Sequence, residues 1–337
     1  MTSRERVAKT LNFESPDRAP RELWALAGVS MFRQDELDAL LERFPSDFGN
    51  PAGEYGPSER KQGTMAVVGT YVDEWGCEWT VAEPGVCGEV KNPPLAEWSA
   101  LDGWQPPWER LDKADLSQTN GSCAASDKYM KGNTDIRPFE RLQFLRGTEN
   151  LFMDLAYMPK ELERLIEMLH EWGLRDMEMW AKTDVDAIGF MDDWGTQHSL
   201  LISPDQWRAL FKPLYKDYCD IAKKAGKRVF FHSDGHTRAI IPDLIEIGID
   251  ALNTQIFCMD IEALASEFKG KITFWGEICR QNIMPFGSVE EVRQAVRRVR
   301  SAFDDGHGGL IAQCEWGNRD PQENIAAVYE TWLEPSV

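Results

Sequence analysis

The second half of the chain alternates short apolar runs with amphipathic stretches. Each run is rich in β-branched or aromatic residues, and each is followed by apolar positions at helical spacing behind a capping residue. The predicted strands are residues 186–191, 228–231, 250–254, 271–275 and 309–313. The following helices are expected to begin near Ser203, Thr237, Asp260, Ser288 and Asp320. Five strand–helix units in succession predict a parallel sheet, because each helix returns the chain to the same end.

A closed barrel explains this pattern better than an open, doubly wound sheet does. The chain has no GxGxxG and no GxxxxGK[ST] motif, and its strands show no break in order that would create a crevice. The sequence therefore predicts the α/β class and a single (β/α)8 TIM barrel. Chemically capable side chains should gather at the carboxyl ends of the strands.

The first half must supply the remaining barrel strands, and its pattern is weaker. The candidate strands are residues 18–24, 66–72 and 141–145. Residues 80–135 are rich in Pro, Gly, Ser and Trp with little periodicity, which is typical of a long loop region over the barrel. We expect residues 1–337 to form a single domain, with 80–135 as a loop-rich insertion.

Composition excludes several classes of function. The 37 Lys and Arg residues against 56 Asp and Glu give a net charge of −19, which would repel nucleic acid. The chain has neither an apolar run near the ~20 residues that a membrane span needs nor a basic start followed by an apolar stretch. Its seven cysteines are scattered without a CxxC motif, which favours a reducing compartment. These features predict a cytoplasmic protein with no membrane and no nucleic-acid partner.

A metal site is one interpretation of the polar residues that follow the predicted strands. His232 and Asp234 lie two positions apart, so in an extended chain both side chains point to the same side. Glu277 and Cys314 follow neighbouring strands and could complete the three protein ligands of a catalytic zinc site. The alternative is a core His232 bonded to Asp234 and a buried, structural Cys314.

Asp192 and Asp193 place two carboxylates at the end of another predicted strand. Phe190 and Trp194 flank them, and an apolar wall of this kind would raise the pKa of a carboxyl and suit a general acid. Either aspartate could equally cap the turn that follows.

Several segments together resemble the uroporphyrinogen decarboxylase superfamily, and specifically its corrinoid-dependent methyltransferase branch. The resemblance covers most of the chain and is carried by residues 3–18, 73–76, 88–91, 190–204, 231–235 and 284–291. It implies a distorted (β/α)8 barrel. It also implies methyl transfer between a small donor or acceptor and the cobalt of a partner corrinoid protein.

Two departures from the family pattern refine that expectation. Decarboxylases of the superfamily carry an Arg-Gln-Ala-Gly-Arg run early in the chain, whereas the matching residues 21–28 here read Arg-Glu-Leu-Trp-Ala-Leu-Ala-Gly. Porphyrinogen decarboxylation is therefore the less favoured alternative. Thiol-methylating members use His-x-Cys with a distant Cys as zinc ligands, and here Asp234 replaces the first cysteine while Cys314 stands for the second.

The resemblance then implies an O-demethylase-like methyltransferase that acts on an ether, such as a methoxylated aromatic. A metal or a protonated carboxyl must hold the departing oxygen, which gives Glu277 a catalytic role beside Asp192 and Asp193. The side chains expected to frame a flat ring, unless they simply pack the core, are Trp24, Tyr71, Trp75, Phe190, Trp194 and Trp275. A thiol or tetrahydrofolate methyltransferase and a noncatalytic corrinoid-docking protein remain as alternatives.

Overall fold

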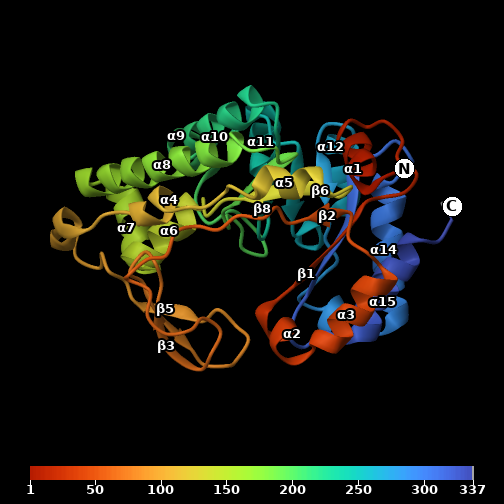
Figure 1. Cartoon of the computed structure of the whole chain (residues 1–337), viewed down its shortest axis with the longest axis horizontal. Helices are drawn as coiled ribbons and strands as arrows, with labels where there is room; N and C mark the ends of the chain where they lie inside the picture. Colours follow the sequence, from red (N-terminus) through yellow and green to blue (C-terminus); the bar gives the residue numbers. More distant parts are fainter. Residues whose placement is uncertain (336–337) are drawn as a thin grey trace.

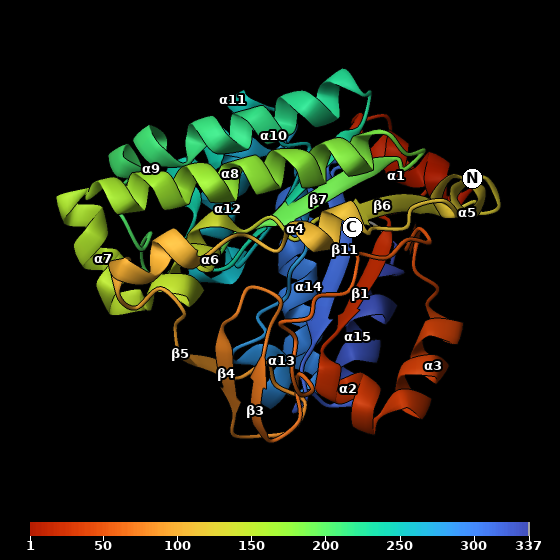
Figure 2. The same cartoon turned by 60° about the vertical axis from the view of Figure 1, so that its left-hand side comes forward.

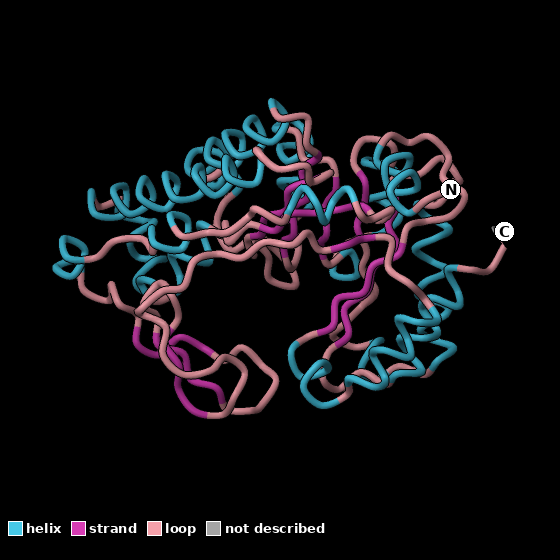
Figure 3. Tube along the Cα trace, in the orientation of Figure 1, coloured by secondary structure: helices cyan, strands magenta, loops and turns pink. Residues whose placement is uncertain are grey.

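Eight parallel strands form the centre of the molecule and curve into a nearly closed barrel (Figure 3). The computed structural model describes residues 1–335. The strands, in the order of the sheet, are β1 (Arg21–Ala25), β11 (Leu310–Trp316), β10 (Thr273–Trp275), β9 (Ala251–Thr254), β8 (Arg228–Ser233), β7 (Ala187–Met191), β6 (Tyr129–Asn133) and β2 (Phe48–Gly49). Every pairing between neighbours in this order is parallel. The predicted α/β barrel is confirmed.

Asp47 connects the two ends of this strand order. Its backbone N–H donates to the carbonyl of Arg21 at 2.9 Å, and its own carbonyl accepts from the N–H of Tyr129 at 2.9 Å. The residue just before β2 therefore bridges β1 and β6, which brings the barrel close to full closure.

Helices surround the barrel (Figures 1 and 2). Their bounds are α1 Ser3–Leu11, α2 Ala27–Phe32, α3 Gln34–Arg43, α4 Trp108–Asp112, α5 Thr119–Ala124, α6 Pro138–Arg146, α7 Thr148–Tyr157, α8 Lys160–Ala181, α9 Pro204–Leu210, α10 Lys212–Lys224, α11 Ile241–Ile247, α12 Ile261–Phe268, α13 Ile283–Phe286, α14 Val289–Phe303 and α15 Gln322–Trp332. The long helices α8 and α10 run side by side along one flank, and α14 packs against α15 on another. Within residues 1–335, no helix is both long and apolar enough to cross a membrane.

The five predicted strand–helix units of the second half are confirmed as β7 to β11 with their helices. Three of the five expected capping residues act as caps, whereas Thr237 and Asp320 make no cap bond to the helices that follow them. Ser203 and Asp260 accept hydrogen bonds from the first turns of α9 and α12, and Ser288 forms a capping box with Glu291 at the start of α14.

The prediction for residues 66–72 is wrong as a barrel strand. Gly69–Val72 is β3 of a separate antiparallel sheet with β4 (Glu78–Val81) and β5 (Glu89–Asn92), seen at the bottom of Figure 1. Met65, Val67 and Val68 are exposed. An apolar run predicts a strand but does not specify the sheet to which the strand pairs.

Residues 141–145 are also not a strand, because they lie inside helix α6. Pro138 occupies the first turn, where its fixed φ favours a helix. Phe139, Leu142 and Leu145 are fully buried at three-residue intervals, which is a helical period. Of the three candidates in the first half, only 18–24 corresponds to a barrel strand, β1.

The stretch 80–135 is more structured than a loop insertion. It contains β5, α4, α5 and, at its end, the barrel strand β6. The sequence Tyr-Met-Lys-Gly-Asn of β6 is poor in β-branched residues, so the pattern gave little sign of a strand there.

Candidate metal centre and substrate cavity

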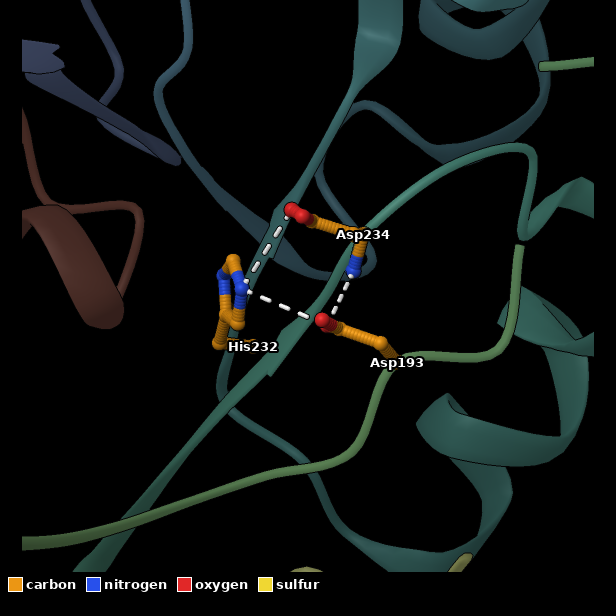
Figure 4. Close-up of side chains that lie close together, drawn as sticks. All are labelled: Asp193, His232 and Asp234. Atoms are coloured by element: carbon orange, nitrogen blue, oxygen red, sulfur yellow. Dashed lines mark hydrogen bonds and ion pairs between the residues drawn. The ribbon is translucent and has the colours of Figure 1, made fainter. Parts of the chain in front are cut away.

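Three side chains at the carboxyl ends of β7 and β8 converge on one point (Figure 4). The Nε2 atom of His232 lies 3.5 Å from Oδ1 of Asp193 and 3.4 Å from Oδ1 of Asp234. His232 lies at the carboxyl end of the barrel with its side chain on the inward face of β8. Asp193 and Asp234 follow the last residues of β7 and β8.

The side-chain amide of Asn253 on β9 determines which nitrogen of the His232 imidazole carries the proton. The Nδ2 group of Asn253 donates to the carbonyl of Trp275 and, at 3.1 Å, to Oε1 of Gln313. Its Oδ1 atom therefore faces Nδ1 of His232, at 2.6 Å, and accepts the proton of that nitrogen. The lone pair of neutral His232 is consequently on Nε2, which points at the two carboxylates.

This donor set fits a divalent metal ion such as zinc. Ligand atoms at 2.0–2.1 Å from a tetrahedral ion lie about 3.3–3.4 Å from one another, close to the distances of Nε2 to the two carboxylates. The Oδ1 atom of Asp234 is buried and has no hydrogen-bond partner among residues 1–335, as expected for an atom that binds a cation. Burial and the nearby charge of Asp234 raise the pKa of Asp193, because both disfavour its ionised carboxylate. A bound cation would stabilise that carboxylate and offset the effect.

A cavity of about 530 Å³ adjoins His232. Aromatic rings from three strands contribute to its wall, and these residues are Trp24, Phe48 and Trp275. Lys131 and Arg137 add two cationic side chains, and Glu22 adds a carboxylate. A flat molecule with a polar end can lie here with its reacting atom beside the three converging ligands.

Residues 138–334 match the sequence model of a family described as uroporphyrinogen decarboxylase (URO-D). This segment is more than half of the 337 residues. The chain belongs to the uroporphyrinogen decarboxylase family. The His232 cluster and all strands from β7 to β11 lie within the matched region.

A solved methyltransferase structure shares the fold of this URO-D protein. A methyltransferase from Methanosarcina mazei superposes with a TM-score of 0.71 at 14% identity and covers 98% of both chains. An endo-β-1,4-xylanase from Gloeophyllum trabeum gives a TM-score of 0.48 at 10% identity, covering 95% of this chain and 98% of its own. No curated protein sequence matches the chain.

Two of the four predicted metal ligands, His232 and Asp234, lie together in the structure, and Asp193 joins them in place of the others. Cys314 is fully buried on the outer side of β11, where its Sγ lies 3.6 Å from the hydroxyl of Tyr329. Glu277 lies behind Arg280, whose Nη2 donates to Oδ2 of Asp234 and whose Nε is 3.8 Å from Oε1 of Glu277. Burial raises the pKa of Glu277 to about 8, although Arg280 acts against that rise.

Asp192 lies on the opposite side of its strand from Asp193. Its carboxylate accepts from the N–H groups of Phe139 and Glu140, both at 2.8 Å, and from the hydroxyl of Tyr215 at 2.6 Å. These bonds hold the first turn of α6 against the end of β7. The structure thus supports the capping alternative for Asp192.

We expect Asp192→Ala to lower the free energy of unfolding by about 3 kcal/mol or more, because up to three buried donors lose their acceptor. Asp193→Asn, one residue away, should change it by less than about 1 kcal/mol. Urea titration of both variants measures the difference. Equal stability of the two would contradict the capping role.

The predicted aromatic frame divides into two groups. Trp24 and Trp275 contribute to the cavity wall. Phe190 borders the cavity, but its ring packs against Tyr215, Tyr218 and Phe231 on the outer side of β7. Tyr71 stacks on Trp79 within the antiparallel sheet. Trp75 and Trp194 are buried in aromatic packing, the first against Trp104 and Trp172 and the second against Phe139 and Phe211.

Sequence reasoning missed four polar residues of the site. They are Lys131, Arg137, Asn253 and Arg280. Asn253 lies within the predicted strand 250–254, but its bond to the imidazole depends on the pairing of β8 with β9. The positions of Lys131 and Arg137 depend on β6 and α6, and the sequence pattern of the first half did not predict these two elements.

The bond from Asn253 to His232 should matter for metal affinity, because such partners orient the ligand and set its tautomer. We expect Asn253→Leu to weaken zinc binding about 10- to 100-fold. Competition with a chromogenic chelator gives the affinity. Thr254→Val is the matched control, since its buried hydroxyl bonds Thr237 and the carbonyl of Gly235 rather than the imidazole, and an equal effect in both variants would contradict the assignment.

Proposed function

We propose that this protein is a metal-dependent methyltransferase that moves a methyl group between a small oxygen-containing substrate and the cobalt of a partner corrinoid protein. The convergence of Asp193, His232 and Asp234 beside an aromatic cavity, at the strand ends of a URO-D family barrel, carries this proposal. The structural likeness to a methyltransferase from Methanosarcina mazei supports the same class of reaction.

The donor set favours an oxygen substrate over a thiol. One imidazole nitrogen and two carboxylate oxygens form a harder site than one built from thiolates, and hard ligands leave a zinc ion a stronger Lewis acid toward oxygen. Cys314, the thiolate that would have softened the site, contacts Tyr329 on the outer side of its strand. An aromatic methyl ether also fits the rings of Trp24 and Trp275.

An ether is a poor methyl donor because its oxygen leaves with a negative charge. When bound, the metal supplies Lewis acidity that stabilises this charge. The methyl carbon–oxygen bond breaks with its electron pair on oxygen, while the reduced cobalt of the partner provides the pair for the new cobalt–carbon bond. Glu277, whose pKa burial raises to about 8, is our candidate proton donor to the departing oxygen.

Visible spectroscopy tests the function directly. Zinc-loaded protein mixed with cob(I)alamin and a methoxybenzoate should convert the Co(I) spectrum to that of methyl-Co(III), and His232→Ala protein should not. Demethylation without any cobalt compound, or conversion of a methylated thiol with no conversion of ethers, would refute this assignment. Decarboxylation of a porphyrinogen would instead favour the decarboxylase alternative.

A further inference from the structure

We infer that the substrate of this cavity carries an anionic carboxylate, and that Arg137 is the residue that binds it. The inference deepens the proposed function, on which it rests, by naming the substrate class: aromatic carboxylic acids that bear a methyl ether. It is drawn from the charges that line the cavity and from the hydrogen bonds that these groups make or lack.

The guanidinium of Arg137 lies on the cavity wall with unused hydrogen-bonding capacity. Its side chain is only 28% exposed, and its Nε atom is buried without a partner among residues 1–335. The nearest carboxylate oxygens belong to Asp135 at 3.9 Å and Glu140 at 3.8 Å, both beyond hydrogen-bond distance. A buried guanidinium with an unused N–H is costly unless a ligand completes its bonds.

The neighbouring Asp135 is already occupied by other donors. It accepts from the indole of Trp75 at 3.1 Å and from Arg110 and Arg141, both at 3.2 Å. Its negative charge is therefore shared with two other arginines. Arg137 lies at ion-pair distance from Asp135 and Glu140 but donates a hydrogen bond to neither, so its N–H groups remain available to a ligand in the cavity.

The second cation on the wall does not compete for the same ligand. The Nζ atom of Lys131 lies 3.4 Å from Oε1 of Glu22 and 3.9 Å from the ring centroid of Trp275. The other oxygen of Glu22 accepts from the indole N–H of Trp275 at 2.6 Å. Lys131 is thus neutralised inside the barrel, and Arg137 remains as the anchor for an anion.

Arg137 is also held at a fixed place relative to the metal ligands. It immediately precedes α6, whose first turn is bonded to Asp192, the neighbour of Asp193. The N–H of Met191 in β7 donates to the carbonyl of Ile136 at 3.2 Å. A rigid link therefore joins the anion-binding arginine to the ligand cluster, and a substrate can contact both with its aromatic ring between them.

Binding calorimetry on zinc-loaded protein, without any corrinoid, tests this inference independently of turnover. Wild-type protein should bind 3-methoxybenzoate at least about tenfold more tightly than uncharged methoxybenzene, and Arg137→Met should weaken methoxybenzoate binding about 10- to 100-fold. Arg137→Lys, which keeps the charge, should recover part of the affinity. Arg164→Met, which removes an exposed arginine paired with Asp102, is the matched control and should bind as wild type does.

Equal affinity for the charged and uncharged ligands in wild-type protein would overturn the inference. So would unchanged methoxybenzoate binding in Arg137→Met, provided that circular dichroism shows the variant folded. Charge-dependent binding through Arg137 without methyl transfer to cobalt would leave the anion site standing and refute the proposed function. The two failures are therefore distinguishable.

Discussion

Purified wild-type protein should contain close to one zinc ion per chain, and His232→Ala and Asp234→Ala should contain almost none. Each variant removes one of three atoms that lie at ligand-to-ligand distance and leaves two carboxylates or one carboxylate with an imidazole. Methyl transfer should fall on the order of 10²- to 10³-fold with the loss of charge stabilisation at the departing oxygen. Elemental analysis of the protein and the cobalt spectrum measure the two effects separately.

Cys314→Ser is the matched control for these two variants. The thiol is fully buried beside the hydroxyl of Tyr329 and away from the ligand cluster, so its replacement should leave the zinc content unchanged. Loss of zinc from Cys314→Ser would contradict the ligand set described here. Retention of zinc by both His232→Ala and Asp234→Ala would contradict the site itself.

The fold of the second half could be predicted because local signals and tertiary structure agree there. Strands β7 to β11 are short apolar runs, and each is followed by a helix, with capping residues at Ser203, Asp260 and Ser288. In the first half, β2 has only two residues and β6 contains a lysine and a glycine. Their pairing is decided by contacts such as the bridge at Asp47, which leave no local pattern.

The sequence predicted that the site lies at the strand ends, but it did not predict the direction in which each side chain points. On the barrel strands, alternate residues face inward, and on β11 these include Gln313 and Glu315, which bond Asn253 and Arg280. Cys314 between them faces outward. The same alternation separates the inward Asp193 from the outward Asp192.

The register of each strand therefore decided which of the polar residues at its end reaches the mouth of the barrel. Inward residues of known strands could have located Glu315 and excluded Cys314. Arg137 could not have been found in this way, because its place depends on helix α6 and on the bonds of that helix to Asp192.

Asp47→Asn should lower the free energy of unfolding by about 3–5 kcal/mol, because it removes one partner from a buried ion cluster. The carboxylate of Asp47 is 1% exposed and accepts from Arg6 at 2.6 Å, from Arg18 at 2.7 Å and from the N–H of Arg21 at 2.7 Å. The variant would leave two guanidinium groups without this counter-charge at the point where β1 and β2 meet. Urea titration at pH 7 measures the loss.

The pH dependence of this loss follows from the pKa of Asp47. Burial acts to raise that pKa, but the bonds from Arg18 and the N–H of Arg21 outweigh it and hold the pKa below its ordinary value of 3.8. A carboxyl whose pKa is lower in the folded state contributes stability above its unfolded pKa and loses it as the pH falls toward the folded value. The difference between wild type and Asp47→Asn should therefore be full at pH 6–7 and shrink below about pH 4.

Asp17→Asn provides the control for this prediction. Asp17 also pairs with Arg6, at 2.5 Å, but its side chain is 42% exposed. Solvent screens such a pair, so its loss should cost about 1 kcal/mol or less. If both variants lose equal stability, the charge of Arg6 alone matters and Asp47 has no special role. A larger loss of stability in Asp47→Asn, which becomes smaller in acid, identifies the carboxylate of Asp47 as the group that joins the two ends of the barrel.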